Sequence, residues 1–182
     1  MKKTIITVCA ALMAVAATTV QAGDTAKAKP EAKQEAKASS KEFEQMKSLV
    51  GKWKGTVDMG QGPVEMTSQY RLIAGGTVLE ERMFADTPHE MVTMFYDQNG
   101  KLAMTHYCML GNRPGMKLKS SDAKSIKFDF DATCGIDPKK ESHMHAMTLT
   151  FDDADTITMS CKGIMDGKEE PDHVTTLKRV KS

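Results

Sequence analysis

Residues 91–108, MVTMFYDQNGKLAMTHYC, predict a β-hairpin whose strands are buried on one face. Apolar and polar side chains alternate on both sides of Asn99-Gly100, and this pair favours a two-residue turn because both of its positions adopt a positive φ readily. Such a turn sets Thr93 opposite His106. One face of the second strand then carries Leu102, Met104, His106, Cys108 and Leu110.

The same alternation runs from residue 52 to the C-terminus, with Gly, Pro, Asn or Asp clusters about every ten residues. It predicts about ten strands, over residues 52–59, 64–73, 77–84, 90–96, 101–110, 115–119, 125–132, 143–151, 156–162 and 173–180. Short strands in up-and-down order close most readily into a barrel, because closure leaves no exposed sheet edge. We therefore expect an all-β, antiparallel up-and-down barrel.

A second hairpin turns at residues 152–154. Pairing apolar residues with apolar residues sets Met147 opposite Met159 and, two residues further from the turn, His145 opposite Cys161. A slip of one residue would send the apolar side chains of one strand outward. The strand face that carries Met147 into the core therefore also carries His143 and His145.

A short helix is expected to precede the strands. Ser39 and Glu42 have the spacing of a capping box, and apolar residues follow at helical intervals. Gly51 can end this helix, because glycine adopts the left-handed conformation without strain.

The N-terminal residues 1–22 have the features of a cleaved secretory signal peptide. Lys2 and Lys3 precede an apolar run, and Val20-Gln21-Ala22 resembles a cleavage site. Residues 23–41 are almost entirely Ala, Lys, Glu and small polar residues, which is typical of a disordered tether. Residues 42–182 are then one domain in a periplasmic or secreted protein. The apolar run is too short for a transmembrane anchor.

Charge and motifs exclude several classes of function. Of 25 basic residues, two lie in the signal peptide, so 23 remain against 24 acidic residues. This balance leaves no basic surface for nucleic acid. The sequence also has no glycine-rich phosphate loop and no nucleophile-elbow pattern. We therefore expect a protein that is not an enzyme.

Three cysteines follow the predicted cleavage site: Cys108, Cys134 and Cys161. The number is odd in a compartment where disulfides form, so at most one internal bridge is possible. Spacing alone leaves open one disulfide plus a buried thiol, or three buried thiols.

Inward-facing polar and sulfur-containing residues make up the candidate site. The predicted ligand-binding set is Trp53, Met104, His106, Cys108, His143, His145, Met147 and Met159. A barrel of this size can hold one small apolar ligand. As an alternative, His106, Cys108, His143, His145 and Cys161 are suited to copper or zinc, and imidazole or Cys also to haem iron. Ordinary core packing, in a structural envelope protein or one that binds a protein partner, explains the same residues.

The segment LVGKWKG, residues 49–55, resembles the opening of the calycin superfamily, which includes lipocalins and fatty-acid-binding proteins. This resemblance implies a lipocalin-like barrel. It also implies that Arg179 of the last strand packs over Trp53, so that both residues close one end of the barrel.

Two further resemblances concern histidines. HYCMLGN (residues 106–112) and HMH (residues 143–145) are similar to segments of uncharacterised exported bacterial proteins with a lipocalin-like domain. More weakly, Asp172-His173-Val174 resembles the last strand of nitrobindins, which implies haem ligation by His173. The nitrobindin Tyr-Pro-Thr segment is absent, and Thr56-Val57-Asp58-Met59 stands in its place.

Overall fold

The structure, a computed structural model, describes residues 39–58, 60 and 62–181. The predicted signal peptide and the predicted tether up to residue 38 lie outside the described residues. Ser40 and Lys41, which we expected in the tether, instead form the N-cap and the first residue of the helix.

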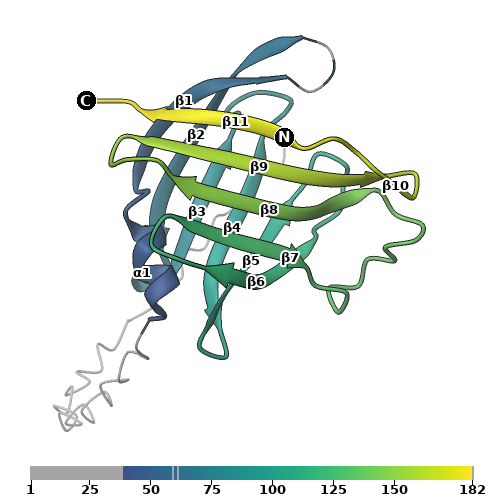
Figure 1. Cartoon of the computed structure of the whole chain (residues 1–182), viewed down its shortest axis with the longest axis horizontal. Coiled ribbons are helices and arrows are strands. Elements are labelled where there is room, and N and C mark those ends of the chain that lie inside the picture. The colour runs from purple at the N-terminus through teal and green to yellow at the C-terminus, as the bar shows by residue number, and fades with distance from the viewer. Residues whose placement is uncertain (1–38, 59, 61, 182) are drawn as a thin grey trace, which may run out of the picture. The chain divides into compact units, whose positions relative to one another are not determined.

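Ten antiparallel strands close into a barrel, which confirms the predicted fold class (Figure 1). Each strand from β1 to β9 pairs with the next along the chain, and β11 lies between β9 and β1. A two-residue strand, β10 (Lys168–Glu169), pairs with the end of β9. The strands of the ring are β1 (Gly51–Asp58), β2 (Pro63–Ile73), β3 (Val78–Met83), β4 (Met91–Gln98), β5 (Lys101–Tyr107), β6 (Gly115–Ser121), β7 (Ser125–Phe130), β8 (His143–Phe151), β9 (Thr156–Met165) and β11 (His173–Arg179).

The barrel closes where β1 and β11 pair, with Trp53 opposite Arg179 and Gly55 opposite Leu177. A β-carbon at position 55 would overlap the carbonyl oxygen of Thr176. Glycine at this position therefore allows the first and last strands to approach closely enough to pair.

The β4–β5 hairpin has the predicted register. Thr93 pairs with His106, and Phe95 pairs with Met104. In the turn, Asn99 has a φ of 53° and Gly100 a φ of 79°. The positive φ angles confirm the turn expected from the Asn-Gly pair.

The β8–β9 register was predicted wrongly. Met147 pairs with Cys161, and Leu149 pairs with Met159, so each partner lies two residues further along β9 than expected. The reason is a longer turn over residues 152–155, in which the Asp153 carboxylate accepts a hydrogen bond from the Asp155 amide at 2.8 Å. A shift of two residues keeps the side chains of residues 146–151 on their expected face, because the strand period is two, whereas a register shift between Met144 and Ala146 interrupts the alternation at His145.

The helix α1 (Lys41–Lys47) packs across one end of the barrel (Figure 1). Ser40, rather than Ser39, is the N-cap, and its hydroxyl accepts a hydrogen bond from the Phe43 amide at 3.1 Å. The amide and the hydroxyl of Ser40 both donate to the carboxylate of Asp97, at the end of β4, at 2.6 Å. Gly51 does not end the helix but begins β1, with a φ of 131°.

Trp53 and Arg179 complete this closed end. Trp53 is 1% exposed and donates its indole N–H to the carbonyl of Leu49 at 2.7 Å. The Arg179 guanidinium lies 4.2 Å from the centre of the Trp53 ring and donates to the carbonyls of Ser48 and Val50, both at 2.8 Å. The packing implied by the calycin resemblance is thus confirmed.

No helix in residues 39–181, as far as these are described, is long and apolar enough to cross a membrane.

Candidate functional site: the barrel cavity

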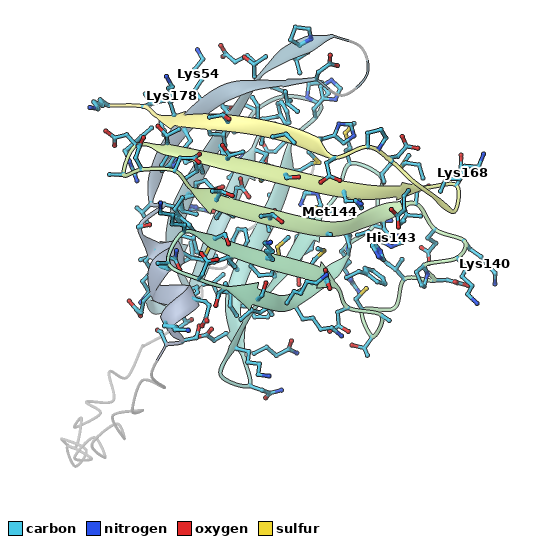
Figure 2. All side chains as sticks on the ribbon, viewed as in Figure 1. Lys54, Lys140, His143, Met144, Lys168 and Lys178 are labelled. Atoms are coloured by element: carbon cyan, nitrogen blue, oxygen red, sulfur yellow. The ribbon has the colours of Figure 1, made fainter. Side chains whose placement is uncertain are left out.

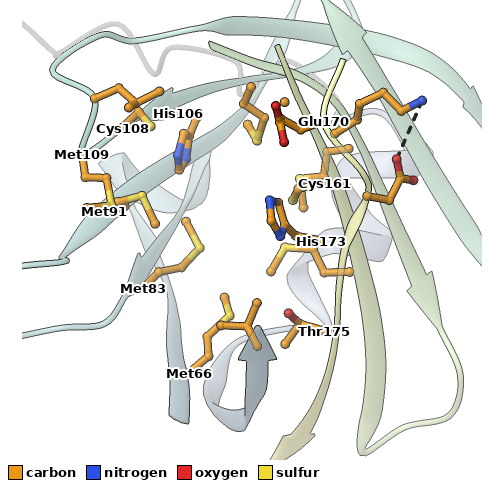
Figure 3. Close-up of a pocket in the computed structure, with 18 of the residues that line it drawn as sticks. Met66, Met83, Met91, His106, Cys108, Met109, Cys161, Glu170, His173 and Thr175 are labelled. Atoms are coloured by element: carbon orange, nitrogen blue, oxygen red, sulfur yellow. Dashed lines mark ion pairs between the residues drawn. The ribbon is translucent and has the colours of Figure 1, made fainter. Parts of the chain in front are cut away.

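The barrel encloses a cavity of about 750 Å³, within the range typical of small-molecule sites (Figure 3). Its rim comes from the β1–β2, β3–β4, β5–β6 and β9–β11 connections and the first residues of β8, at the end of the barrel away from α1. Figure 2 places His143 and Met144 at this end. The exposed rim residues Met109, Leu110 and Met165 give the opening apolar edges.

Methionine dominates the wall of the cavity. Eight of the twelve methionines among the described residues line it: Met66, Met83, Met91, Met109, Met144, Met147, Met159 and Met165. Thioether side chains are apolar, polarisable and flexible, so they adapt to ligands of different shapes. The wall is therefore suited to an apolar ligand.

The cavity brings together five of the eight predicted ligand-binding residues: His106, Cys108, His143, Met147 and Met159. The other three, Trp53, Met104 and His145, lie outside its lining. Trp53 and Met104 face inward, but both lie in the tightly packed core. Strand alternation predicts which face a residue occupies but not its depth along the barrel axis, so it could not separate core positions from cavity positions.

A row of polar side chains crosses four adjacent strands inside this largely apolar barrel. Tyr70 on β2 pairs with Glu81 on β3, Glu81 pairs with Thr93 on β4, and Thr93 pairs with His106 on β5. All four are at most 5% exposed. Residues paired directly across strands project from the same face of the sheet, so the row is continuous.

Glu81 is the acidic member of this row and is 1% exposed. One carboxylate oxygen, Oε1, accepts hydrogen bonds from the Tyr70 hydroxyl at 2.6 Å and the Ser68 hydroxyl at 2.9 Å. The other, Oε2, is buried without a hydrogen-bond partner among the described residues. Burial raises the pKa of Glu81, and the hydroxyls of Tyr70, Ser68 and Thr93 oppose that rise in part.

His106 is neutral at physiological pH. Burial lowers its pKa to about 4, because the protonated imidazole would lose its hydration. Its Nδ1 lies 3.0 Å from the hydroxyl oxygen of Thr93. The His106 ring therefore contributes hydrogen-bonding capacity to the cavity wall but no charge.

His143 and His145 form a pair at the start of β8. The Nδ1 of His143 lies 2.6 Å from the carbonyl oxygen of Glu141, which can only accept, so this nitrogen carries the proton. The Nε2 of His143 lies 3.1 Å from Nδ1 of His145, within hydrogen-bond distance. The ring of Phe130 packs against both imidazoles. A register shift between Met144 and Ala146 turns His145 out of the regular alternation, which explains its absence from the cavity lining.

The three cysteines of the described chain are free thiols. Cys108 and Cys161 line the cavity, whereas Cys134 lies in the β7–β8 connection outside it. Burial, with smaller contributions from the charges of Glu81 and Asp172, raises the pKa of Cys161 to about 12. Cys161 is therefore a thiol rather than a nucleophilic thiolate at neutral pH.

The predicted metal-binding set does not converge on one point. Within the described ranges, no three His, Cys, Asp or Glu side chains are arranged to hold a metal ion. The geometric reason is that His143 is within hydrogen-bond distance of His145 on β8, whereas His106 on β5 is within hydrogen-bond distance of Thr93 on β4, at another part of the wall. His173, the residue carried over from the nitrobindin resemblance, lines the cavity at its exposed rim, with Nδ1 3.2 Å from the Asp58 carbonyl oxygen.

Sequence reasoning missed Glu81, although the sequence held a signal for it. The segment from Leu79 to Met83 alternates with apolar residues inward, and Glu81 occupies an inward position between them. A carboxylate on a core face is rarely found without a partner or a function. The acidic residues of the rim, such as Glu170 and Asp172, come from a connection whose path over the opening no periodicity predicts.

No protein-family model matches this sequence, and no curated protein matches it. The calycin and nitrobindin resemblances therefore stay predictions. The fold and the cavity are the basis for assigning a function.

Proposed function

We propose that this protein is an exported, non-enzymatic barrel that binds a small apolar molecule in its cavity. The observation that carries the proposal is the cavity of about 750 Å³ with its eight methionines. Empty apolar space of this size inside a protein is unfavourable, because the side chains around it lose packing contacts. An apolar ligand restores those contacts, and the signal-like sequence of residues 1–22 supports export.

Binding of Nile red, a neutral dye that fluoresces in apolar surroundings, tests this proposal. Thr175 on β11 is 3% exposed and lines the cavity, so Thr175→Phe places a ring in the space a ligand would use. We expect the wild-type protein to bind the dye and Thr175→Phe to weaken binding by roughly tenfold or more. Fluorescence titration gives both affinities.

Thr176→Phe is the matched control. Thr176 is the next residue of the same strand and is exposed, so the same substitution adds the same ring outside the barrel. It should leave dye binding within about twofold of wild type. Equal loss in both variants, or no saturable binding by the wild type, would contradict the proposal. Circular dichroism and thermal melting confirm that each variant is folded.

A second candidate is binding of monovalent copper. The concentration of thioethers at the cavity wall, with the Cys108 and Cys161 thiols beside them, favours it because soft sulfur ligands select Cu(I). Since no cluster of His, Cys and carboxylate ligands among the described residues supports it, most of the ligands would have to be methionines. Titration with Cu(I) against a chelator of known affinity separates the two: submicromolar one-to-one binding supports copper, and its absence leaves the apolar ligand.

A further inference from the structure

We propose, on the basis of the ligand-binding function above, that the natural ligand is an apolar molecule carrying a protonated amine, and that Glu81 recognises that amine. This names a chemical class of ligand and the residue that selects it.

The first argument is the unbalanced hydrogen bonding of Glu81. The Tyr70 and Ser68 hydroxyls both donate to Oε1, and the Thr93 hydroxyl beside Glu81 lies 3.0 Å from Nδ1 of His106, so Oε2 has no hydrogen-bond partner among the described residues although Glu81 lines the cavity. A buried polar atom without a hydrogen bond is costly, so it is normally satisfied by a group that binds there. The flexible methionines around the cavity can move to let a ligand reach this oxygen.

The second argument is the charge of the cavity wall. Four acidic side chains line it, namely Asp58, Glu81, Glu170 and Asp172, against one basic side chain, Lys162. The ammonium of Lys162 lies 3.4 Å from Glu169 and 3.8 Å from Asp172, so acidic neighbours already offset its charge. The wall thus attracts a cation and repels an anion.

The third argument concerns the other groups that face Glu81. Tyr70, Ser68, Thr93 and Cys161 surround it, and none of them supplies a positive charge. The imidazole of His106, beyond Thr93, is neutral at physiological pH because its pKa is about 4. The Glu81 carboxyl has no positive charge in its surroundings, and a ligand ammonium bound there would supply one and favour the ionised carboxylate.

Competition against Nile red with three compounds of one chain length tests the inference. Dodecylamine is cationic, dodecanol is neutral and dodecanoate is anionic, and each is used below the concentration at which it forms micelles or separates from water. A charge-assisted hydrogen bond predicts that the amine displaces the dye about tenfold to a hundredfold more strongly than the alcohol. We expect dodecanoate to be the weakest competitor.

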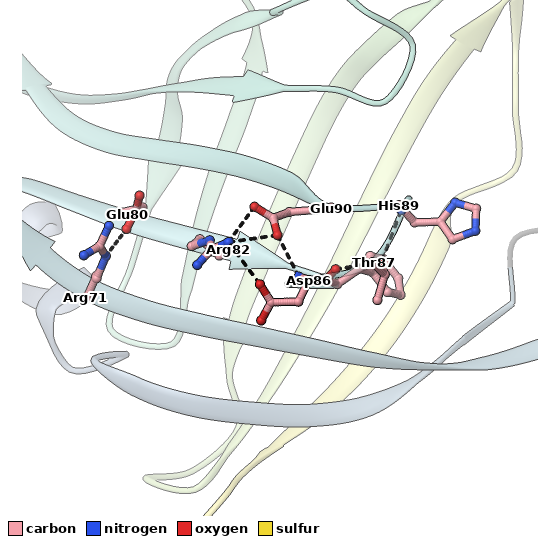
Figure 4. A network of polar contacts seen from close by, with 8 residues as sticks. Arg71, Glu80, Arg82, Asp86, Thr87, His89 and Glu90 are labelled. Carbon is pink, nitrogen blue, oxygen red and sulfur yellow. Dashed lines mark hydrogen bonds and ion pairs between the residues drawn. The ribbon is translucent and has the colours of Figure 1, made fainter.

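Glu81→Gln should remove the difference between amine and alcohol, because it keeps the shape and loses the charge. Glu80→Gln is the matched control. Glu80 is the next residue of β3, faces the outside of the barrel and pairs with Arg71 there (Figure 4). This variant loses the same charge outside the cavity, so it should keep the wild-type preference for the amine.

The outcomes separate this inference from the proposed function. If Nile red binds but the wild type shows no preference for the amine, the inference is wrong and the apolar cavity site stands. A preference that persists in Glu81→Gln overturns the role of Glu81. No Nile red binding at all contradicts the proposed function itself. If Glu81→Gln fails to fold, the order of the three competitors on the wild type still decides whether the ligand is an amine.

Discussion

Glu81 and His106 respond to burial in opposite directions. Burial penalises the charged form of each, so the pKa of the carboxyl rises and the pKa of the imidazole falls to about 4. Both lie in the same cross-strand row, separated by Thr93. Their contributions to the free energy of unfolding therefore change with pH in opposite directions.

The pH dependence of stability is expected to change when His106 is replaced. The imidazole pKa is near 6.5 in the unfolded chain and about 4 in the folded protein. The unfolded state therefore binds more protons in this window, and stability falls as the pH falls from about 6.5 towards 4. His106→Gln should lose less stability than wild type between about pH 7 and pH 4.5, by on the order of 2 kcal/mol. Urea unfolding at the two pH values measures this.

Glu81 changes the stability with pH in the opposite direction. Its raised pKa means that the folded state holds a proton longer than the unfolded state, so its contribution to stability decreases as the pH rises. Glu81 is present in both proteins and cancels in the comparison to first order. His89→Gln, in the exposed β3–β4 connection (Figure 4), is the control and should follow wild type. If His106→Gln and wild type have the same pH profile, His106 is not buried as described.

At the scale of elements, α1 depends on its contact with the barrel. Seven residues are too few for a stable isolated helix, so packing must hold it. Phe43 and Met46 are at most 1% exposed. Full burial of each such side chain contributes about 1.5–3 kcal/mol to the free energy of unfolding. Ser40 adds the N-cap and two hydrogen bonds to Asp97, which tie the start of the helix to β4.

Ser40→Ala is expected to destabilise the protein by about 1–2 kcal/mol, because it removes the cap and one of the bonds to Asp97. Ser39→Ala is the control, since Ser39 is exposed and does not cap the helix. It should change the free energy of unfolding by less than about 0.5 kcal/mol. Chemical denaturation measures both variants. The reverse order would mean that the capping box read from the sequence, with Ser39 as the cap, is correct.

The elements also show which features a sequence can predict. The β4–β5 register followed from Asn99-Gly100, because a two-residue turn fixes the pairing locally. Two registers of the β8–β9 hairpin, two residues apart, place the same side chains in the core. The structure has the register with the longer turn, in which the Asp153 carboxylate accepts a hydrogen bond from the Asp155 amide. Turn chemistry of that kind is not visible in the apolar pattern.

The whole molecule has two unlike ends. α1, Trp53 and Arg179 close one end by tight packing, and the other end opens onto the methionine-lined cavity. The sequence predicted the barrel and most of the inward faces, since period-two alternation encodes them. It did not predict the depth of each residue along the barrel, so Trp53 and Met104 were expected at the ligand together with His106. Depth depends on register around the whole ring, which no single hairpin determines.

Nuclear magnetic resonance of ¹³C-methyl-labelled methionine tests the central claim most directly, because methionine lies both inside the cavity and outside it. Addition of dodecylamine should shift the methyl signals of cavity residues such as Met83, Met147 and Met159. The signals of Met46 and Met116, in the packed core outside the cavity lining, should stay in place. Shifts confined to the core methionines, or no shifts at saturating ligand, would contradict the account.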